Sequence, residues 1–307
     1  AYAKIHLYQQ LVESNFAHDD AMRTHLELYF PTLMRERFAE SVASHRLRKE
    51  IVCTVVANEI VNREGMSFVF RLGEETGGAP ADIARAYLVA RETFAMPAFW
   101  AGVESLDNVV TATVQTHMLL EGRRLQERAA RWIARHAQSP INICEVSARY
   151  GAGVEALAPT LRELLPVGRA EDIRANADEL IGQGVPVELA ERAALMPELF
   201  AMLDVVDVAA TASEGLTEVA AVYFGLDANM ELGWLRDQII ALPRDNRWEA
   251  LSRAALRDDL YSLQAALTTQ VLAISQADEE PSVRIRGWSA EHETAVGRYR
   301  QVMMELN

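Results

Sequence analysis

The stretch RLGEETGGAPADIARAY, residues 71–87, decides between two fold classes. It overlaps the end of an apolar run, 66–72, and leads into a segment with helical spacing. The turn between them holds three glycines, Gly73, Gly77 and Gly78. An apolar strand, a glycine-rich turn and a helix, in that order, build the phosphate-binding loops of nucleotide-binding α/β folds. The same order also suits a corner between two helices, because glycine commonly ends a helix.

The residues beside the glycines favour the helix corner. A P-loop requires G-x-x-x-x-G-K-[ST], and Gly73 and Gly78 have that glycine spacing. However, an Ala-Pro pair ending at Pro80 replaces the required Lys and Ser or Thr. Glu74 and Glu75 would also place two negative charges beside a bound phosphate. Pro80 suits the first turn of a helix instead. We therefore predict a helix–turn–helix corner here and no nucleotide site.

Helical spacing of apolar residues continues along nearly the whole chain. Residues 249–274 read as one long helix, and SFVFRL at 67–72 has the residue types of a strand but no second strand to pair with. Within 46–62 we predict that the apolar stripe contains Leu47, Ile51, Val55, Asn58 and Val61. The sequence therefore predicts an all-α, multi-helix fold.

Composition limits the classes of function. The chain has 307 residues and a net charge of −14, which disfavours binding to nucleic acid. It contains no uninterrupted apolar run of about 18 residues, so we expect no membrane span, and its first residues do not resemble a signal peptide. Its two cysteines, Cys53 and Cys144, are far apart in the sequence and fit a reducing cytoplasm.

One predicted helix carries a row of arginines. Arg124, Arg128, Arg131 and Arg135 are spaced by three or four residues, so they share one face of a helix. This face is either a solvated surface interleaved with glutamates or a salt-bridged contact with another domain or subunit. The four arginines are the possible interface residues that the sequence offers.

The domain organisation is predicted from prolines, linkers and a weak internal similarity. The echo pairs Pro80 with Pro186 and Leu106 with Leu203, and it suggests two related helical modules. The acidic, proline-containing stretch SQADEEPS would link the second module to a terminal helix. The predicted parts are N-terminal helices at 1–65, module one at 66–165, module two at 173–275 and a C-terminal helix at 283–307.

No group of residues in the sequence forms a catalytic motif. The histidines form no HExxH pair, and no G-x-S-x-G elbow occurs. Residues 143–164 imitate a DNA-binding helix-turn-helix, but the second helix is acidic and contains Pro159. We therefore assign no catalytic, cofactor-binding or metal-binding residue.

Several of these stretches resemble one enzyme family. HRLRKEIVCTVVANEIVNREGMSFVFRLGEETGGAPADIARAYLVARETF, residues 45–94, is similar to the region that follows the catalytic domain in large bacterial NAD-specific glutamate dehydrogenases, most of all the mycobacterial type. LDNVVTATVQTHMLLEGRRL, EVAAVYFGL and LPRDNRWEALSRAALRDDLYSLQ continue the resemblance over nearly the whole chain.

The resemblance implies a parent enzyme that converts L-glutamate, NAD and water to 2-oxoglutarate, ammonium and NADH. The family's NAD fingerprint and catalytic residues belong to the preceding domain, and they are absent from this sequence. We therefore expect no cofactor in this fragment, and a non-catalytic scaffold whose partners are the catalytic domain and other subunits of a cytoplasmic homo-oligomer, a tetramer. The alternative is a regulatory module that binds a small effector between helices.

Overall fold

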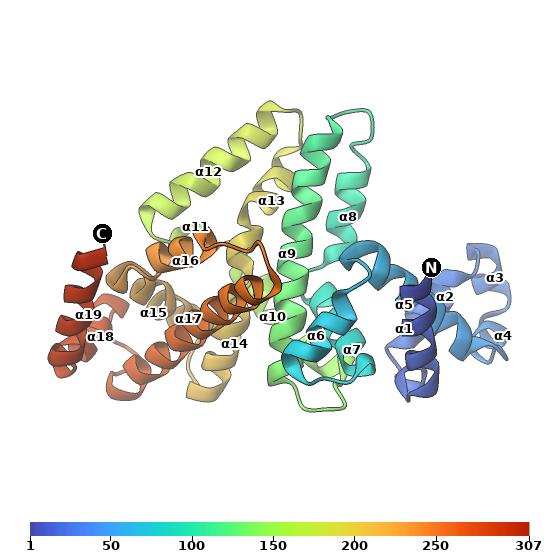
Figure 1. Ribbon diagram of the computed structural model, residues 1–307, viewed down its shortest axis with the longest axis horizontal. Helices are drawn as coiled ribbons and strands as arrows, with labels where there is room; N and C mark the ends of the chain where they lie inside the picture. The colour runs from blue at the N-terminus through green and yellow to red at the C-terminus, as the bar shows by residue number, and fades with distance from the viewer. Residues whose placement is uncertain (307) are drawn as a thin grey trace. The chain divides into compact units, whose positions relative to one another are not determined.

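The computed structural model describes residues 1–306, and its secondary structure is helical throughout (Figure 1). About 80% of these residues are helical, and no strand occurs among them. The prediction of an all-α fold is therefore confirmed. No helix within the described range is both long and apolar enough to cross a membrane. The chain divides into two compact units, 1–152 with 180–197, and 153–179 with 198–307.

The first unit contains most of the N-terminal half of the chain. Its helices begin with a layer in which α1 and α2 pack on α5, and continue with α6 to α9. Their bounds are α1 Tyr2–Glu13, η1 Phe16–His18, α2 Met22–Tyr29, α3 Thr32–Arg37, α4 Ala39–Ala43, α5 Arg48–Glu64, α6 Phe68–Thr76, α7 Pro80–Thr93, α8 Met96–Glu104 and α9 Ala112–His136.

The helix pair α7 and α9 forms the core of this unit, and Figure 1 shows the two side by side. Helix α7 is buried along almost its whole length, so apolar and small residues occupy most of its positions. Gln126 of α9 is completely buried, and its Nε2 donates to the carbonyl oxygen of Tyr87 at 2.8 Å. The Tyr87 hydroxyl donates to Glu59 of α5 at 3.0 Å. A buried polar pair thus fixes the register of three helices.

The corner predicted from the opening stretch is confirmed. Helix α6 ends at Gly77, whose φ of 73° is left-handed and is strained for residues with a side chain. The Thr76 hydroxyl accepts from the Gly78 backbone N–H at 3.2 Å, and Pro80 starts α7. SFVFRL is therefore helical, because its apolar positions Phe68 and Leu72 lie one turn apart and are both buried.

The second unit is built around α14, α15 and α17, which pack against one another. Three helices, α10, α12 and α13, contribute residues to both units. The bounds of the remaining helices are α10 Ile143–Leu157, α11 Leu161–Leu164, α12 Val167–Gly182, α13 Val187–Leu199, α14 Ala201–Ala212, α15 Leu216–Met230, α16 Leu232–Ala241, α17 Arg247–Ile274, α18 Pro281–Glu291 and α19 Glu293–Leu306.

A polar arrangement in the second unit repeats that of the first. Gln264 of α17 is completely buried, and its Nε2 donates to the carbonyl oxygen of Tyr223 on α15 at 3.0 Å. The Tyr223 hydroxyl donates to Asp204 of α14 at 3.2 Å. In both units a buried tyrosine bonds an acid on an earlier helix, and a buried glutamine of a later long helix bonds the tyrosine's carbonyl. The two units therefore share a helix–short helix–long helix pattern.

This similarity differs from the predicted echo. Pro80 and Pro186 each stand at a helix start, but Leu106 lies in the turn after α8 whereas Leu203 lies inside α14. The predicted pairing of Leu106 with Leu203 is therefore wrong, because short Ala- and Leu-rich matches recur by chance in helices. The tyrosine and glutamine positions are the ones that correspond.

The compact units also cut the chain differently from the predicted ranges. Residues 180–197 belong to the first unit although they fall in the predicted second module, 173–275. Where one C-terminal helix was expected over 283–307, the described residues contain α18 and α19, separated at His292. Whether the predicted ranges are independent domains stays a prediction.

Candidate functional site

A buried ionic cluster joins α5, α6 and α9 of the first unit. The guanidinium of Arg71 on α6 donates to both carboxylate oxygens of Glu127 on α9, one of them at 2.9 Å. Arg131 of α9 donates through Nε to Glu75 of α6 at 2.7 Å and contacts Glu127 at 3.4 Å. These charge-assisted bonds hold α6 against α9.

Glu64, the last residue of α5, is the unusual member of this cluster. Its side chain is 1% exposed, and neither carboxyl oxygen has a hydrogen-bond partner. Burial, reinforced by the negative charge of Glu127, raises the pKa of Glu64 from 4.5 to about 8. Arg123, Arg71 and Arg63 act in the opposite direction but do not overcome burial. Glu64 is therefore protonated at neutral pH.

Arg123 and Glu127 complete the electrostatics. Arg123 donates to the Glu64 backbone carbonyl at the end of α5, where a positive charge is favourable. Burial opposes ionisation of Glu127, but the hydrogen bond from Arg71 and the nearby arginines lower the pKa of Glu127 overall. One carboxyl is thus neutral and the other ionised. Such divergence can mark an acid and base pair, but Glu64 lines no cavity that would admit a substrate. The arrangement holds the helices in place.

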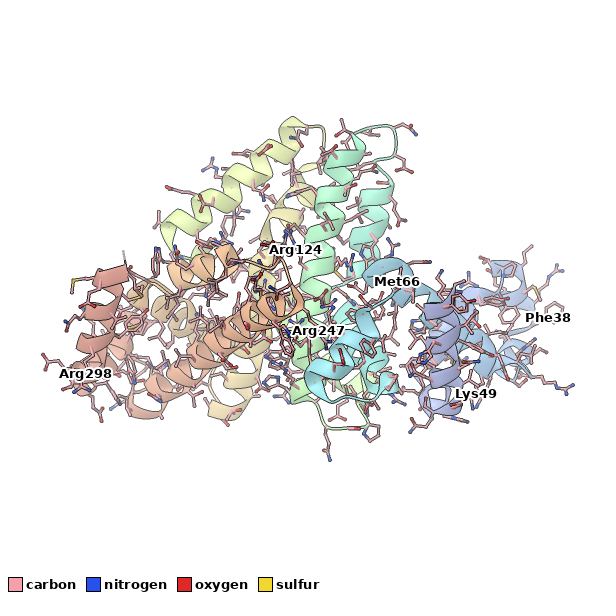
Figure 2. The ribbon with its side chains drawn as sticks, viewed as in Figure 1. Phe38, Lys49, Met66, Arg124, Arg247 and Arg298 are labelled. Carbon is pink, nitrogen blue, oxygen red and sulfur yellow. The ribbon has the colours of Figure 1, made fainter. Side chains whose placement is uncertain are left out.

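The four arginines predicted to share an exposed face have different environments. Arg131 is 4% exposed and paired inside the unit, so the prediction of exposure is wrong for this residue. Arg124, labelled in Figure 2, has a side chain 59% exposed and pairs with Glu121 of its own helix. Arg128 is half-buried and Arg135 is exposed. Helical spacing gave the face correctly, but α6 covers the position of Arg131.

An apolar groove of about 550 Å³ lies in the same unit, next to the α5–α6 turn. Leu7 of α1 and Ile60 of α5 are buried side chains in its lining. Three large apolar side chains that also line it are strongly exposed: Tyr2 is 91%, Met66 79% and Phe70 69% exposed. Its other lining residues are Ala3, His6, Gln10, Val61, Gly65, Val69, Gly73, Glu74 and Pro80.

Comparison with known proteins places the chain in a family. The family model described as "Glutamate dehydrogenase, C-terminal" matches residues 1–307. The chain belongs to this family. It is 35%, 33% and 31% identical over 306 residues to proteins named NAD-specific glutamate dehydrogenase from Pseudomonas aeruginosa, Halomonas elongata and Mycobacterium tuberculosis. The match covers 100% of this chain but only 19% of each relative, and the mycobacterial protein is matched no better than the other two.

The relatives are named for NAD, but the glycine turn of this glutamate dehydrogenase C-terminal chain does not fit a pyrophosphate. The turn meets the C-terminal, carbonyl end of α6, which repels anions. Asp82 occupies the first turn of α7 and accepts from the Ser139 hydroxyl at 2.6 Å. A Cβ at Gly78 would lie 2.9 Å from Ile83 Cδ1, so this glycine serves close helix packing. No catalytic step is assigned to these residues.

Two features of the site were missed by sequence reasoning. The buried stripe of α5 runs through Val52, Val56 and Ile60, one position away from the predicted stripe, and Glu64 continues it. The acid four residues after Ile60 was therefore the available signal for a buried carboxyl. No sequence signal identified the groove, because it depends on how α1 and α6 are placed about α5. Within residues 1–306 no group of three His, Cys, Asp or Glu side chains could hold a metal ion.

Proposed function

We propose that this chain is the C-terminal helical domain of an NAD-dependent glutamate dehydrogenase and acts as a non-catalytic scaffold. The observation that carries the proposal is the match over the whole chain to only 19% of each relative. The parent would oxidise L-glutamate with NAD and water to 2-oxoglutarate, ammonium and NADH. Its NAD would bind to the part of the parent outside this chain.

The proposed partners are the catalytic domain of the same chain and other subunits of a homo-oligomer, a tetramer in the cytoplasm. The exposed apolar side chains around the groove support a contact role, because large apolar patches on folded proteins often mark interaction sites. Arg124 and Arg135 remain proposed interface residues since both are exposed on α9. Arg128 contributes less surface, and Arg131 is excluded by burial.

The regulatory alternative receives less support. A small polar effector is recognised by a concave site with a few convergent polar groups. The groove is lined mainly by apolar and aromatic side chains, with His6, Gln10 and Glu74 as its main polar members. That lining suits an apolar protein surface better than a charged metabolite.

The non-catalytic role is tested by calorimetric titration of NAD into the purified chain 1–307 and by a glutamate oxidation assay, with the full-length parent as the positive control. We expect saturable NAD binding and turnover for the parent only. Saturable binding by the 307-residue chain, abolished by Gly78→Val while the helical circular-dichroism signal is unchanged, would refute the proposal.

A further inference from the structure

We propose that the apolar groove of the first unit is the docking site for an apolar segment of the parent polypeptide upstream of residue 1. The inference rests on the proposed function, which makes this chain part of a longer enzyme. It adds the contact surface and the occupant. The contact-forming residues are Tyr2 on α1, Met66 in the α5–α6 turn and Phe70 on α6, and Figure 2 labels Met66 in that turn.

The groove has the chemistry of a protein-binding surface. Tyr2, Met66 and Phe70 each leave more than two thirds of their surface exposed to water. Aromatic side chains and methionine are enriched in the buried centres of protein interfaces. A methionine beside two aromatic rings also adapts its shape to an apolar partner. A scattered surface apolar residue needs no explanation, but three around one concavity do.

The groove is also held in shape before any partner arrives. Helix α6, which carries Phe70, is fixed to α9 by the Arg71–Glu127 and Arg131–Glu75 ion pairs. The turn that carries Met66 starts at Gly65, whose φ of 90° is left-handed, and Arg123 bonds the preceding carbonyl. A pre-formed surface loses little conformational entropy on binding, so even a modest apolar contact is favourable.

Covalent connection decides between possible occupants. The relatives are about five times longer than this chain, and the family model describes the matched part as C-terminal, so most of the parent polypeptide precedes residue 1. Tyr2 is itself a wall of the groove, which places the preceding residues within a short tether of it. A short tether gives an effective concentration on the order of millimolar. A second copy at micromolar concentration would compete poorly against it.

Photo-crosslinking in the full-length parent identifies the occupant. Phe70 is replaced by the photo-reactive analogue benzoylphenylalanine, and the crosslinked peptides are identified by mass spectrometry. A matched variant carries the analogue at Phe38, which is 55% exposed on the same unit but does not line the groove. We expect the Phe70 position to crosslink within one polypeptide to a peptide upstream of residue 1. The Phe38 position should give no crosslink to that peptide.

A second readout guards against a crosslink that fails for chemical reasons. Met66 oxidation by dilute hydrogen peroxide is followed in the parent carrying Phe70→Asp or the control Phe38→Asp. Because Phe70 is exposed in this chain, the change should leave the unit folded. We expect Phe70→Asp to raise Met66 oxidation about tenfold, and the control to change it less than twofold.

Three results would overturn the inference: rapid Met66 oxidation in the unaltered parent, equal effects of the two variants, or a crosslink to residues 1–307 of another subunit. The scaffold proposal fails separately, if the parent assembles and turns over without residues 1–307. An upstream crosslink could still be found in that case.

Discussion

Replacing Glu64 with glutamine should remove a pH-dependent loss of stability from the first unit. The folded unit holds the Glu64 proton up to a pKa of about 8, whereas the unfolded chain releases it near 4.5. The folded state therefore binds more protons between these values, and stability falls as pH rises. Burial of Glu64 against Glu127, opposed by Arg63, Arg71 and Arg123, sets this window. Below pH 4.5 the stabilisation by the proton is complete.

The size of the effect follows from the shift. Each pKa unit corresponds to about 1.4 kcal/mol, so the chain should lose about 3 kcal/mol relative to Glu64→Gln between pH 5.5 and pH 7.5. Hydrogen exchange of α6 and α9 peptides measures local opening of the two proteins at each pH, and intrinsic exchange rates cancel in the comparison. Glu155→Gln, at an exposed position, is the matched control and should show no such trend.

A constant difference between Glu64→Gln and the unaltered chain from pH 5.5 to pH 8.5 would refute this reasoning. It would mean that Glu64 is ionised in the folded unit, with its charge compensated by the arginines.

Two further predictions concern arginines. Arg284 is 2% exposed and donates two 2.7 Å bonds to Glu214, so Arg284→Met should destabilise the second unit by about 3–5 kcal/mol, because it leaves a buried carboxylate unpaired. Thermal unfolding by circular dichroism measures this, and a loss below about 1 kcal/mol would contradict it. Charge reversal at both Arg124 and Arg135 in the parent should weaken subunit assembly in analytical ultracentrifugation without unfolding the chain, since exposed charges contribute little to stability. Unchanged assembly would exclude the arginine interface.

The existence of the helices was largely predictable, because apolar spacing reports local periodicity. The faces that they bury were less so. Ile51 and Val55 of α5 were expected in the core, but Val52 and Val56 are the buried positions. Apolar residues occur on more than one side of α5 because α1, α2, α7 and α9 all contact it. A single-stripe prediction fails on such a helix.

The ionic cluster could not be assembled from sequence for a related reason. Arg71 and Glu127 are 56 residues apart, and no local rule brings them together. Arg124 and Arg131 lie seven residues apart on nearly the same face, yet one is exposed and the other buried. The difference arises because α6 covers only part of α9. Residue type and spacing specified the helix surface, whereas tertiary packing decided which part of it meets water.

The most direct test of the scaffold role is the assembly of the full-length parent with and without residues 1–307. Sedimentation velocity gives the oligomeric state of each protein, and glutamate-dependent NADH formation gives its activity. We predict that the shortened enzyme fails to form the parent's oligomer and loses most of its turnover. A shortened enzyme that assembles and oxidises glutamate as the intact parent does would contradict the account.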